Sequence, residues 1–524
     1  MRRRLVLSLL SLLVPLSAFL YWYFVVDTPA PKVRVGKETT YITEPVDDEG
    51  FLDYQAALND RLGKDITPEQ NANVLLWKAI GPTPEGGDGM PAEYFQWLGI
   101  DEPPKDGDYL VGLSAYTKDR LKLGTDASAA ILDEQLWAAK RPWAAEDYPH
   151  IAAWLKANEK PLAVVVEATK RPEYFNPLVS PRKGNEPTSL LNALLPSVQK
   201  CREVVTALAG RAMLRVSEGK LDDAWQDLLA CHRLARLVAR GGTLIEALVG
   251  VALDKVTSVA DLAYLESAGL TAQQVQERLS DLQALPPFPP LADKIDLAER
   301  FVYLETMQLI RRRGPSALDA LVGGSARKGT PGEIKGVEKI DWEPALINGN
   351  QWYDRLADAL RQKDRAERKK ALGQIDNDLQ ALKKGIPGSN ALSRLFLDNK
   401  ARGKAMGDLI LTLLMPAFGK VQDAYDRAEQ TQRNLHLAFA LAAYQRDNGR
   451  YPAKLDDLAP KYLAAVPDDL FSGKALLYRP AEKGYLLYSV GVNGKDEGGR
   501  QYDDDPPGDD LAVRMPLPEL KRKK

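Results

Sequence analysis

The stretch RDNGRYPAKLDDL, residues 446–458, marks the point where the chain changes from helices to strands. Before it runs a long amphipathic pattern with one apolar face, formed by Leu435, Ala438, Phe439, Ala442 and Ala443. Gly449 accepts the left-handed conformation that ends a helix, and Pro452 prevents the helix from resuming. The sequence therefore predicts a long helix that stops at Gly449, followed by a short helix in AKLDDLAPKYLA.

Strand-like runs follow this short helix. KALLYRP (474–480) and GYLLYSVG (484–491) are rich in β-branched and aromatic residues, and the turn AEKG lies between them. This spacing favours an antiparallel hairpin, and DLAVRMP (510–516) predicts a third strand. Residues 404–516 are thus expected to form an α+β domain, in which a long helix packs on a small antiparallel sheet.

The order of these elements, with the motifs DNGRYP and YSVGVNG, resembles the globular part of type IV pilin-like proteins. This part of the chain is similar to the major pseudopilin of type II secretion, over about residues 405–515. That family has a calcium site in the loop before its last strand. The resemblance implies a calcium site here as well, in which Asn493 and Asp510 match positions of the family's pattern; Asp496 and Asp509 of the same acidic loop complete the candidate ligand set. The basic leader, cleavage-site glycine and early glutamate of a pilin do not adjoin the apolar segment at the amino terminus, so pilin processing is not expected.

The loop between Asn493 and Asp510 has a composition that suits calcium. It combines glycines with a series of carboxylates: Asp496, Glu497, Asp503, Asp504, Asp505, Asp509 and Asp510. Calcium takes about six to eight oxygen ligands in flexible loops, and glycine leaves main-chain carbonyls accessible. The spacing is not that of an EF-hand. A solvated acidic loop that holds no ion is the alternative.

The amino terminus carries a membrane signal. After three arginines, residues 5–26 (LVLSLLSLLVPLSAFLYWYFVV) contain no charge in 22 positions, and as a helix they would extend about 33 Å, enough to cross a bilayer core. The arginines and the terminal aromatic residues predict an uncleaved signal anchor in the bacterial inner membrane. Its amino end would be cytoplasmic and the bulk of the chain periplasmic. A cleaved signal peptide is the alternative, because Ser17 and Ala18 are small residues.

The region between the anchor and the pseudopilin-like part shows helical patterning interrupted by loops. SEGK (217–220) joins two apolar-periodic segments, similar to one tetratricopeptide hairpin, but no second copy is found at the period of that repeat. A glycine-rich stretch near 323–338 suggests a possible subdivision. The predicted organisation is a cytoplasmic end (1–4), an anchor (5–26), a linker (27–47), a helical periplasmic domain (48–403), a pseudopilin-like domain (404–516) and a basic tail (517–524).

Composition limits the chemistry. The 70 Lys and Arg residues nearly balance 72 Asp and Glu residues, so no net field favours nucleic acid. Two cysteines and three dispersed histidines do not form a usual zinc site. Cys201 and Cys231 would miss each other by about 9 Å in an antiparallel hairpin, so a disulfide requires staggered helices. Cys231 is expected in the core, and His232 either at the surface or in a hydrogen bond between helices.

No sequence motif of a hydrolase, nucleotide-binding enzyme or metalloprotease is present. The sequence therefore predicts a mainly α, membrane-anchored scaffold or adaptor that binds envelope proteins, lacks catalytic residues and is stabilised by calcium. The alternative is an envelope enzyme that acts on glycan or peptide through a cleft in the helical domain. A buried, unpaired carboxylate in a large cleft would favour the enzyme. A closed helical core with an exposed apolar groove would favour the scaffold.

Overall fold

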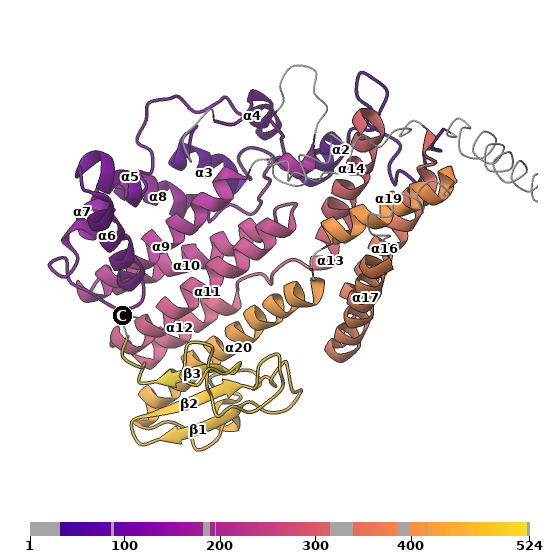
Figure 1. Cartoon of the computed structure of the whole chain (residues 1–524). Helices are drawn as coiled ribbons and strands as arrows, with labels where there is room; N and C mark the ends of the chain where they lie inside the picture. The colour runs from indigo at the N-terminus through magenta and orange to yellow at the C-terminus, as the bar shows by residue number, and fades with distance from the viewer. Residues whose placement is uncertain are drawn as a thin grey trace, which may run out of the picture. The chain divides into compact units, whose positions relative to one another are not determined.

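The computed structural model describes residues 32–84, 89–181, 189–193, 195–314, 339–385, 398–415 and 417–520. The fold is mainly helical, with one small antiparallel sheet near the carboxyl end (Figure 1). The chain divides into two compact units. The first comprises Met1–Arg61, Leu178–Leu194 and Pro290–Gly419, and the second comprises Leu62–Pro177, Leu195–Pro289 and Lys420–Lys524. Each unit thus combines segments that are distant in sequence.

The first unit is built from helices of the amino-terminal and central segments. They are α2 (Tyr54–Gly63, which continues into the second unit), η3 (Leu190–Asn192), α13 (Leu291–Lys294), η4 (Ile295–Glu299), α14 (Arg300–Arg313), α16 (Glu343–Arg361), α17 (Arg365–Gly385) and α19 (Asn399–Leu414). Arg300 is fully buried; its guanidinium pairs with Asp296 at 2.6 Å and lies 4.2 Å from the ring centre of Tyr41. This arrangement satisfies a buried charge by ion pairing and aromatic contact.

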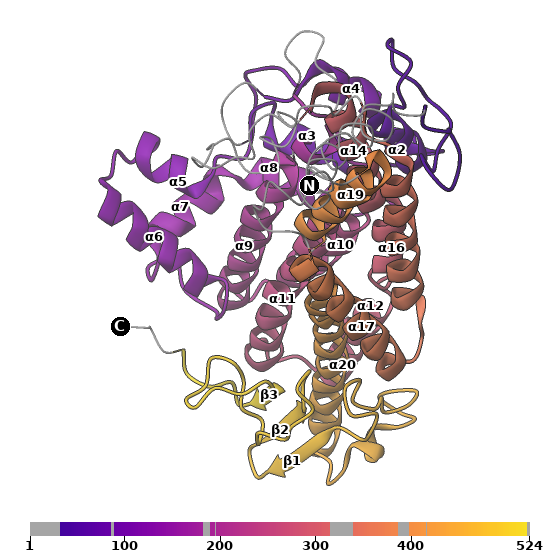
Figure 2. The ribbon, with the colours of Figure 1, turned by 45° about the vertical axis from the view of Figure 1, so that its right-hand side comes forward.

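The second unit begins with short helices and continues with long ones (Figure 2). The short ones are α3 (Ala72–Ile80), α4 (Ala92–Leu98), α5 (Leu113–Ala115), η2 (Tyr116–Arg120), α6 (Thr125–Ala138), α7 (Pro149–Ala157) and α8 (Glu159–Ala168). The long ones are α9 (Pro196–Ser217), α10 (Leu221–Ala239) and α11 (Leu244–Ser267), and the shorter α12 (Ala272–Gln283) follows them. The predicted turn between α9 and α10 is confirmed, with Gly219 at φ +75°.

Local sequence explains where α11 and α12 begin. Thr243 and Glu246 form a capping box at the start of α11, and Thr271 and Gln274 form another at the start of α12. In each box the threonine side chain accepts a hydrogen bond from the backbone N–H of the Glu or Gln, and the Glu or Gln side chain accepts a hydrogen bond from the backbone N–H of the threonine. Both ends are therefore fixed by side chains within the same turn.

The carboxyl-terminal part contains the predicted elements. Helix α20 (Phe418–Asn448) ends before Gly449 at φ +71°, which confirms the stop. The expected short helix is a single 3₁₀ turn, η7 (Leu455–Leu458). Strands β1 (Leu477–Ala481), β2 (Gly484–Ser489) and β3 (Leu511–Met515) form an antiparallel sheet in the order β1-β2-β3. The predicted hairpin and third strand are both confirmed.

Helix α20 is buried on more than one face. Leu437, Phe439 and Leu441 are all fully buried, and the Phe439 ring lies 5.8 Å from that of Trp225 on α10. Leu487 of β2 belongs to the same hydrophobic core. Because the helix packs against both the long helices and the sheet, residues 420–524 share one compact unit with helical segments. The sequence boundary at 403/404 does not coincide with a division between units.

In the part of the chain that the structure describes, no helix is sufficiently long and apolar to cross a bilayer. The predicted anchor (5–26) lies outside the described residues, as do the cytoplasmic end (1–4) and the glycine-rich stretch (323–338).

Candidate functional site: a buried ion network

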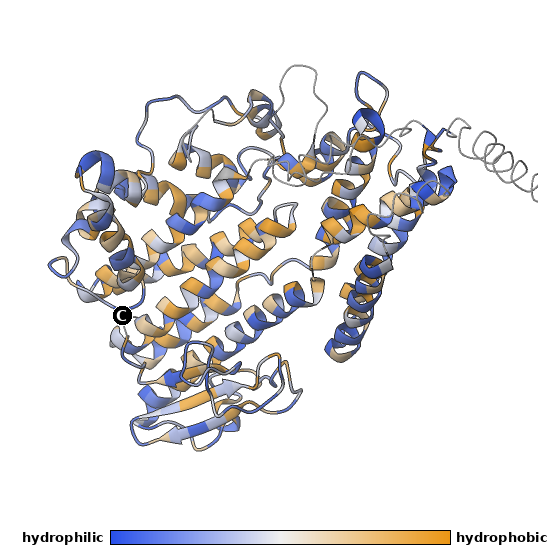
Figure 3. Cartoon of the chain, in the orientation of Figure 1, coloured by the Kyte–Doolittle hydropathy of each residue, from blue (hydrophilic) through white to orange (hydrophobic). Residues whose placement is uncertain are grey.

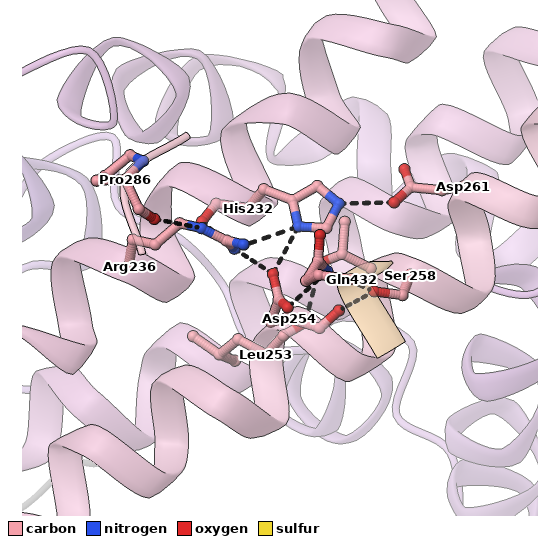
Figure 4. Close-up of polar contacts among 9 residues, drawn as sticks. His232, Arg236, Leu253, Asp254, Ser258, Asp261, Pro286 and Gln432 are labelled. Atoms are coloured by element: carbon pink, nitrogen blue, oxygen red, sulfur yellow. Dashed lines mark hydrogen bonds and ion pairs between the residues drawn. The ribbon is translucent and has the colours of Figure 1, made fainter. Parts of the chain in front are cut away.

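A cluster of polar side chains lies inside the second unit, where α10, α11 and α20 meet (Figure 4). We use the name ion network for the four charged residues at its centre, which are His232 and Arg236 of α10 and Asp254 and Asp261 of α11. His232 and Arg236 are four positions apart on α10, and Asp254 and Asp261 are seven positions apart on α11. Each pair therefore lies on one face of its helix. The cluster is completed by Ser258 of α11 and Gln432 of α20.

His232 is held between two carboxylates. Its Nδ1 atom lies 2.6 Å from Asp254 Oδ1, and its Nε2 atom lies 2.6 Å from Asp261 Oδ2. An imidazole can donate at both nitrogens only when it is protonated. Burial disfavours the charged form, but the charges of Asp261 and Asp254 outweigh it and raise the pKa of His232 to about 9. His232 is therefore a cation at neutral pH.

Arg236 supplies the second cation. Its Nη1 atom donates to Asp254 Oδ1 and to the His232 carbonyl oxygen, and its guanidinium lies 4.8 Å from the ring centre of Phe288. Burial alone would raise the pKa of Asp254, but Arg236 and His232 lower it to about 2. Two cations thus face two carboxylates. This balance explains how a helical interior contains four ionisable groups without an uncompensated charge.

Gln432 connects α20 to the ion network. Its Nε2 atom donates to Asp254 Oδ2 at 2.7 Å and to Ser258 Oγ at 3.0 Å. Asp254 therefore accepts from three helix-borne side chains, one on α20 and two on α10. His436 lies one turn further along α20. Its burial and the charges of His232 and Arg236 lower its pKa to about 4. His436 is neutral, and it adds no charge beside the network.

The ion network is closed to solvent. The side chains of His232, Asp254 and Asp261 have exposures of 0%, 2% and 0%. Asp261 Oδ1 is buried and has no hydrogen-bond partner among the described residues. Burial raises the pKa of Asp261, although His232 opposes the shift. A carboxylate in this position could hold a proton, but no substrate can contact it without opening the helices.

A shallow hollow of about 310 Å³ lies elsewhere in the second unit. It is lined by Trp137, Arg141, Pro142, Trp143, Asp147, Tyr148 and Leu520. Asp147 is the one carboxylate in this lining, and its Oδ2 atom accepts a hydrogen bond from the Ala144 amide at 2.8 Å. Glycoside hydrolysis commonly uses two carboxylates that flank the bond. The lining of this hollow does not supply that pair.

The four predicted calcium ligands lie in the β2–β3 loop, and their side-chain oxygens bind backbone amides. Asn493 Oδ1 accepts from Lys495 (2.7 Å), Asp496 Oδ1 from Gly498 (2.9 Å) and Asp509 Oδ2 from Asn493 (2.9 Å). Asp510 Oδ2 accepts from Glu497 (3.1 Å) and Gly499 (2.7 Å). Within the described residues, no three His, Cys, Asp or Glu side chains are arranged to hold a metal ion. Calcium binding stays a prediction.

The cysteine and histidine predictions have clear outcomes. Cys231 is buried in the core as expected, and both cysteines are free. Cys231 Sγ lies 3.8 Å from the carbonyl oxygen of Val205, so the two thiols miss by about one turn, because Cys201 lies four residues before Val205. For His232 the hydrogen bond between helices is confirmed, and a surface position is wrong.

The sequence did not reveal the ion network as a unit. Its signal is a pair of acids seven residues apart on α11, opposite a His and an Arg four residues apart on α10. Comparison of the chain with protein-family models, with curated proteins and with solved structures finds no match. The resemblance to pseudopilins therefore rests on the motifs alone.

Proposed function

We propose that the chain is a non-catalytic scaffold or adaptor of the bacterial envelope. Residues 5–26 anchor it in the inner membrane, and the bulk of the chain lies in the periplasm. Residues 404–516 contribute a pseudopilin-like module. The observation that carries the proposal is the contrast between a closed, internally paired core and an exposed apolar helix face. A scaffold needs a stable core and a binding surface, whereas an enzyme needs reactive groups that substrate can reach.

The closed core supports a structural role for the ionisable groups. The ion network is charge-balanced and buried, and the shallow hollow lined by Trp137 and Tyr148 has a single carboxylate. Perturbed pKa values often mark active sites, but ion pairs inside a protein perturb them as well. Here the charged partners account for the shifts of His232 and Asp254.

The exposed apolar face lies on α11. Ile245, Val256 and Val259 have exposures of 54%, 40% and 39%. Val256 lies 11 positions after Ile245 and Val259 lies 14 positions after it, about three and four helical turns, so all three are on one side of the helix. Figure 3 shows hydrophobic residues along this helix. An apolar stripe of this kind is typical of a protein–protein contact surface.

The position of α20 supports an adaptor rather than a polymerising pilin. In this chain the long helix is enclosed by α10, α11 and the sheet, and Gln432 binds the ion network. A helix that is already buried on several faces is not available to pack in a fibre of equivalent helices. The pseudopilin-like module would instead expose its loops to a partner protein while α20 stays packed against α10, α11 and the sheet.

The proposal includes calcium in the β2–β3 loop. Asp510 supports it, because the residue is 1% exposed and its Oδ1 atom has no hydrogen-bond partner among the described residues. Burial, opposed by two backbone amides, raises the pKa of Asp510. Calcium would supply a positive charge to this oxygen. Because Asn493, Asp496 and Asp509 already accept backbone hydrogen bonds, the ion would have to replace some of these bonds.

The proposal is tested with the tagged full chain in its own membrane. Carbonate washing should leave the protein in the membrane, and protease added to spheroplasts should digest the bulk of the chain. Cross-linking in intact cells followed by mass spectrometry should then recover defined envelope proteins. A matched variant, Val256→Glu, changes the exposed apolar face without touching the ion network and should lose those proteins.

Two results would contradict the proposal. One is removal of the chain by carbonate together with protection from protease, which would place it elsewhere. The other is turnover of a glycan or peptide by the purified chain that is unchanged in Val256→Glu, which would favour the envelope enzyme.

A further inference from the structure

The segment that follows β3 is held at the surface of the second unit by two side chains. Residues 516–520 (PLPEL), which we call the carboxyl-terminal segment, have no regular secondary structure. The Leu517 amide donates to Glu266 Oε1 near the end of α11, at 2.7 Å. The Pro518 carbonyl oxygen accepts from Arg141 Nη2 in the loop between α6 and α7, at 2.8 Å. We use the name clamp for Arg141 and Glu266, which here bind main-chain atoms of two successive residues.

The main chain of a Pro-x-Pro sequence suits this clamp. Proline has no backbone N–H, so Leu517 carries the one main-chain donor of residues 516–518, and Glu266 accepts it. Arg141 has donors and no acceptor, and it binds the carbonyl oxygen that follows. Burial lowers the pKa of Arg141, while the charge of Glu266 opposes the shift, so the two charges of the clamp lie near each other. The carboxylate and the guanidinium thus match a successive N–H and C=O.

The shallow hollow of about 310 Å³ adjoins the clamp, because Arg141 belongs to both. Its aromatic wall is held in place. Trp143 Nε1 donates to the Gly210 carbonyl oxygen at 3.0 Å, and the rings of Trp143 and Tyr148 meet edge to face at 5.6 Å. Leu520 is part of the lining and is 37% exposed, and the volume of the hollow is what remains beside it. The carboxyl-terminal segment therefore reaches the hollow without filling it.

We propose that the clamp and the shallow hollow form a peptide-binding site, at which a Pro-x-Pro segment of a partner protein replaces the carboxyl-terminal segment. The partner segment carries an aromatic residue two positions after its second proline, where this chain has Leu520. The clamp binds the partner's main chain as it binds residues 517–518, and the aromatic ring enters the hollow beside Trp143 and Tyr148. Proline-rich segments bind grooves lined by aromatic rings, because their restricted backbone loses little freedom on binding. An aromatic ring also buries more apolar surface than leucine and makes edge-to-face contacts with other rings.

The carboxyl-terminal segment can leave this site without unfolding the sheet. Residues 516 and 518–520 are exposed, and Leu517 is partly buried against the core. Strand β3 ends at Met515, so its pairing with β2 stays intact on release. The tethered segment has an effective concentration of roughly millimolar, which lowers the apparent affinity for a free peptide. A partner must therefore bind more tightly than the native sequence, and the aromatic residue provides the difference.

Titration of the full chain with dye-labelled peptides, followed by fluorescence anisotropy, tests the site. The first peptide has the sequence of residues 515–520 with a carboxyl-terminal amide, and the second is its Leu520→Trp form. The chain is the Leu517→Pro variant, whose own segment lacks the N–H that Glu266 accepts. We expect the Leu520→Trp peptide to bind this variant about tenfold more tightly than the first peptide. Both peptides should bind the native chain roughly tenfold more weakly than the variant, because the tethered segment competes.

Matched variants separate the clamp from a general effect of charge. In the Leu517→Pro background, Arg141→Met should weaken binding of the Leu520→Trp peptide roughly tenfold. Lys156→Met, which removes a cation on the exposed side of α7, should leave the affinity unchanged. A form of the peptide with both prolines replaced by alanine should bind more weakly than the original.

Three results would each overturn the proposal. They are no binding of the Leu520→Trp peptide at millimolar concentration, equal affinity of the two peptides, and equal affinity of the Arg141→Met and Lys156→Met chains. Melting temperatures check that the variants fold, and the comparison of peptides can be repeated on the native chain. The site does not depend on the membrane anchor or the envelope location proposed above, so failure of either would leave the peptide affinities unchanged.

Discussion

The ion network and the β2–β3 loop both contain carboxylates, but different groups satisfy them. In the ion network, side-chain cations on a neighbouring helix face Asp254 and Asp261, and the interior excludes water. In the loop, backbone amides of nearby residues donate to Asp496, Asp509 and Asp510, and Asp509 also pairs with Arg427 of α20 at 3.0 Å. The first arrangement depends on contacts between distant segments. Apart from the ion pair of Asp509 with Arg427, the second depends on the local path of the chain.

This difference predicts that Asp254→Ala lowers the unfolding free energy more than any other variant considered below. The substitution leaves His232 and Arg236 with one carboxylate between them in a closed interior. Removing one partner of a buried ion pair typically costs about 3–5 kcal/mol of unfolding free energy. Urea denaturation of the full chain measures this. The loop variant Asp496→Ala is the control, and we expect it to cost less than about 1 kcal/mol. Equal losses in the two variants would contradict the comparison.

The pH dependence of stability tests the charge on His232. Its pKa is raised in the folded chain, from an ordinary value of 6.5 to about 9. The contribution of protonated His232 to the unfolding free energy is therefore fully present below pH 6.5 and is lost as the pH rises through about 9. On the order of 3 kcal/mol of unfolding free energy should disappear across this interval.

The matched variant for this titration is His232→Gln, which keeps a polar side chain without an ionisable group. Its stability should be lower at pH 6.5 and nearly flat up to pH 9. Measurements should stop there, because the cysteine thiols of the unfolded chain begin to titrate near their ordinary pKa of 9. A slope in His232→Gln equal to that of the native chain would show that another group titrates.

Much of the carboxyl-terminal fold could be predicted from the sequence, because its signals are local. Gly449 and Pro452 end α20, and a short run of aromatic and apolar residues after the turn AEKG defines β2. The ion network could not be predicted in the same way. His232 and Asp261 are 29 residues apart, and their contact depends on how two helices pack. For the same reason the enclosure of α20 was not predicted, since amphipathicity showed one apolar face while packing buries several.

Gln432→Leu breaks the link between α20 and the ion network, with an intermediate effect. Asp254 Oδ2 and Ser258 Oγ would each lose a hydrogen-bond donor in a buried place. An unsatisfied buried group costs about 1–3 kcal/mol. The control is Gln422→Leu on the same helix. The Gln422 Nε2 atom donates to Asp426 Oδ1 within α20, at 2.7 Å. Hydrogen exchange should speed up along α20 in Gln432→Leu only. Equal protection in both variants would contradict a role of Gln432 in holding the helix.

The smallest expected effect concerns calcium and the β2–β3 loop. If calcium binds beside Asp510, millimolar calcium should raise the melting temperature of the full chain by a few degrees relative to chelator, because a ligand that binds only the folded state stabilises it. Asp510→Asn removes the charge of the buried oxygen and should abolish this shift. Asp426→Asn on α20 is the control, since that residue is also buried but lies outside the loop. Amide exchange at Gly499 would report the replacement of its hydrogen bond to Asp510. Identical melting with calcium and with chelator would leave the loop carboxylates with a purely structural role, in which backbone amides and the ion pair of Asp509 with Arg427 compensate their charge.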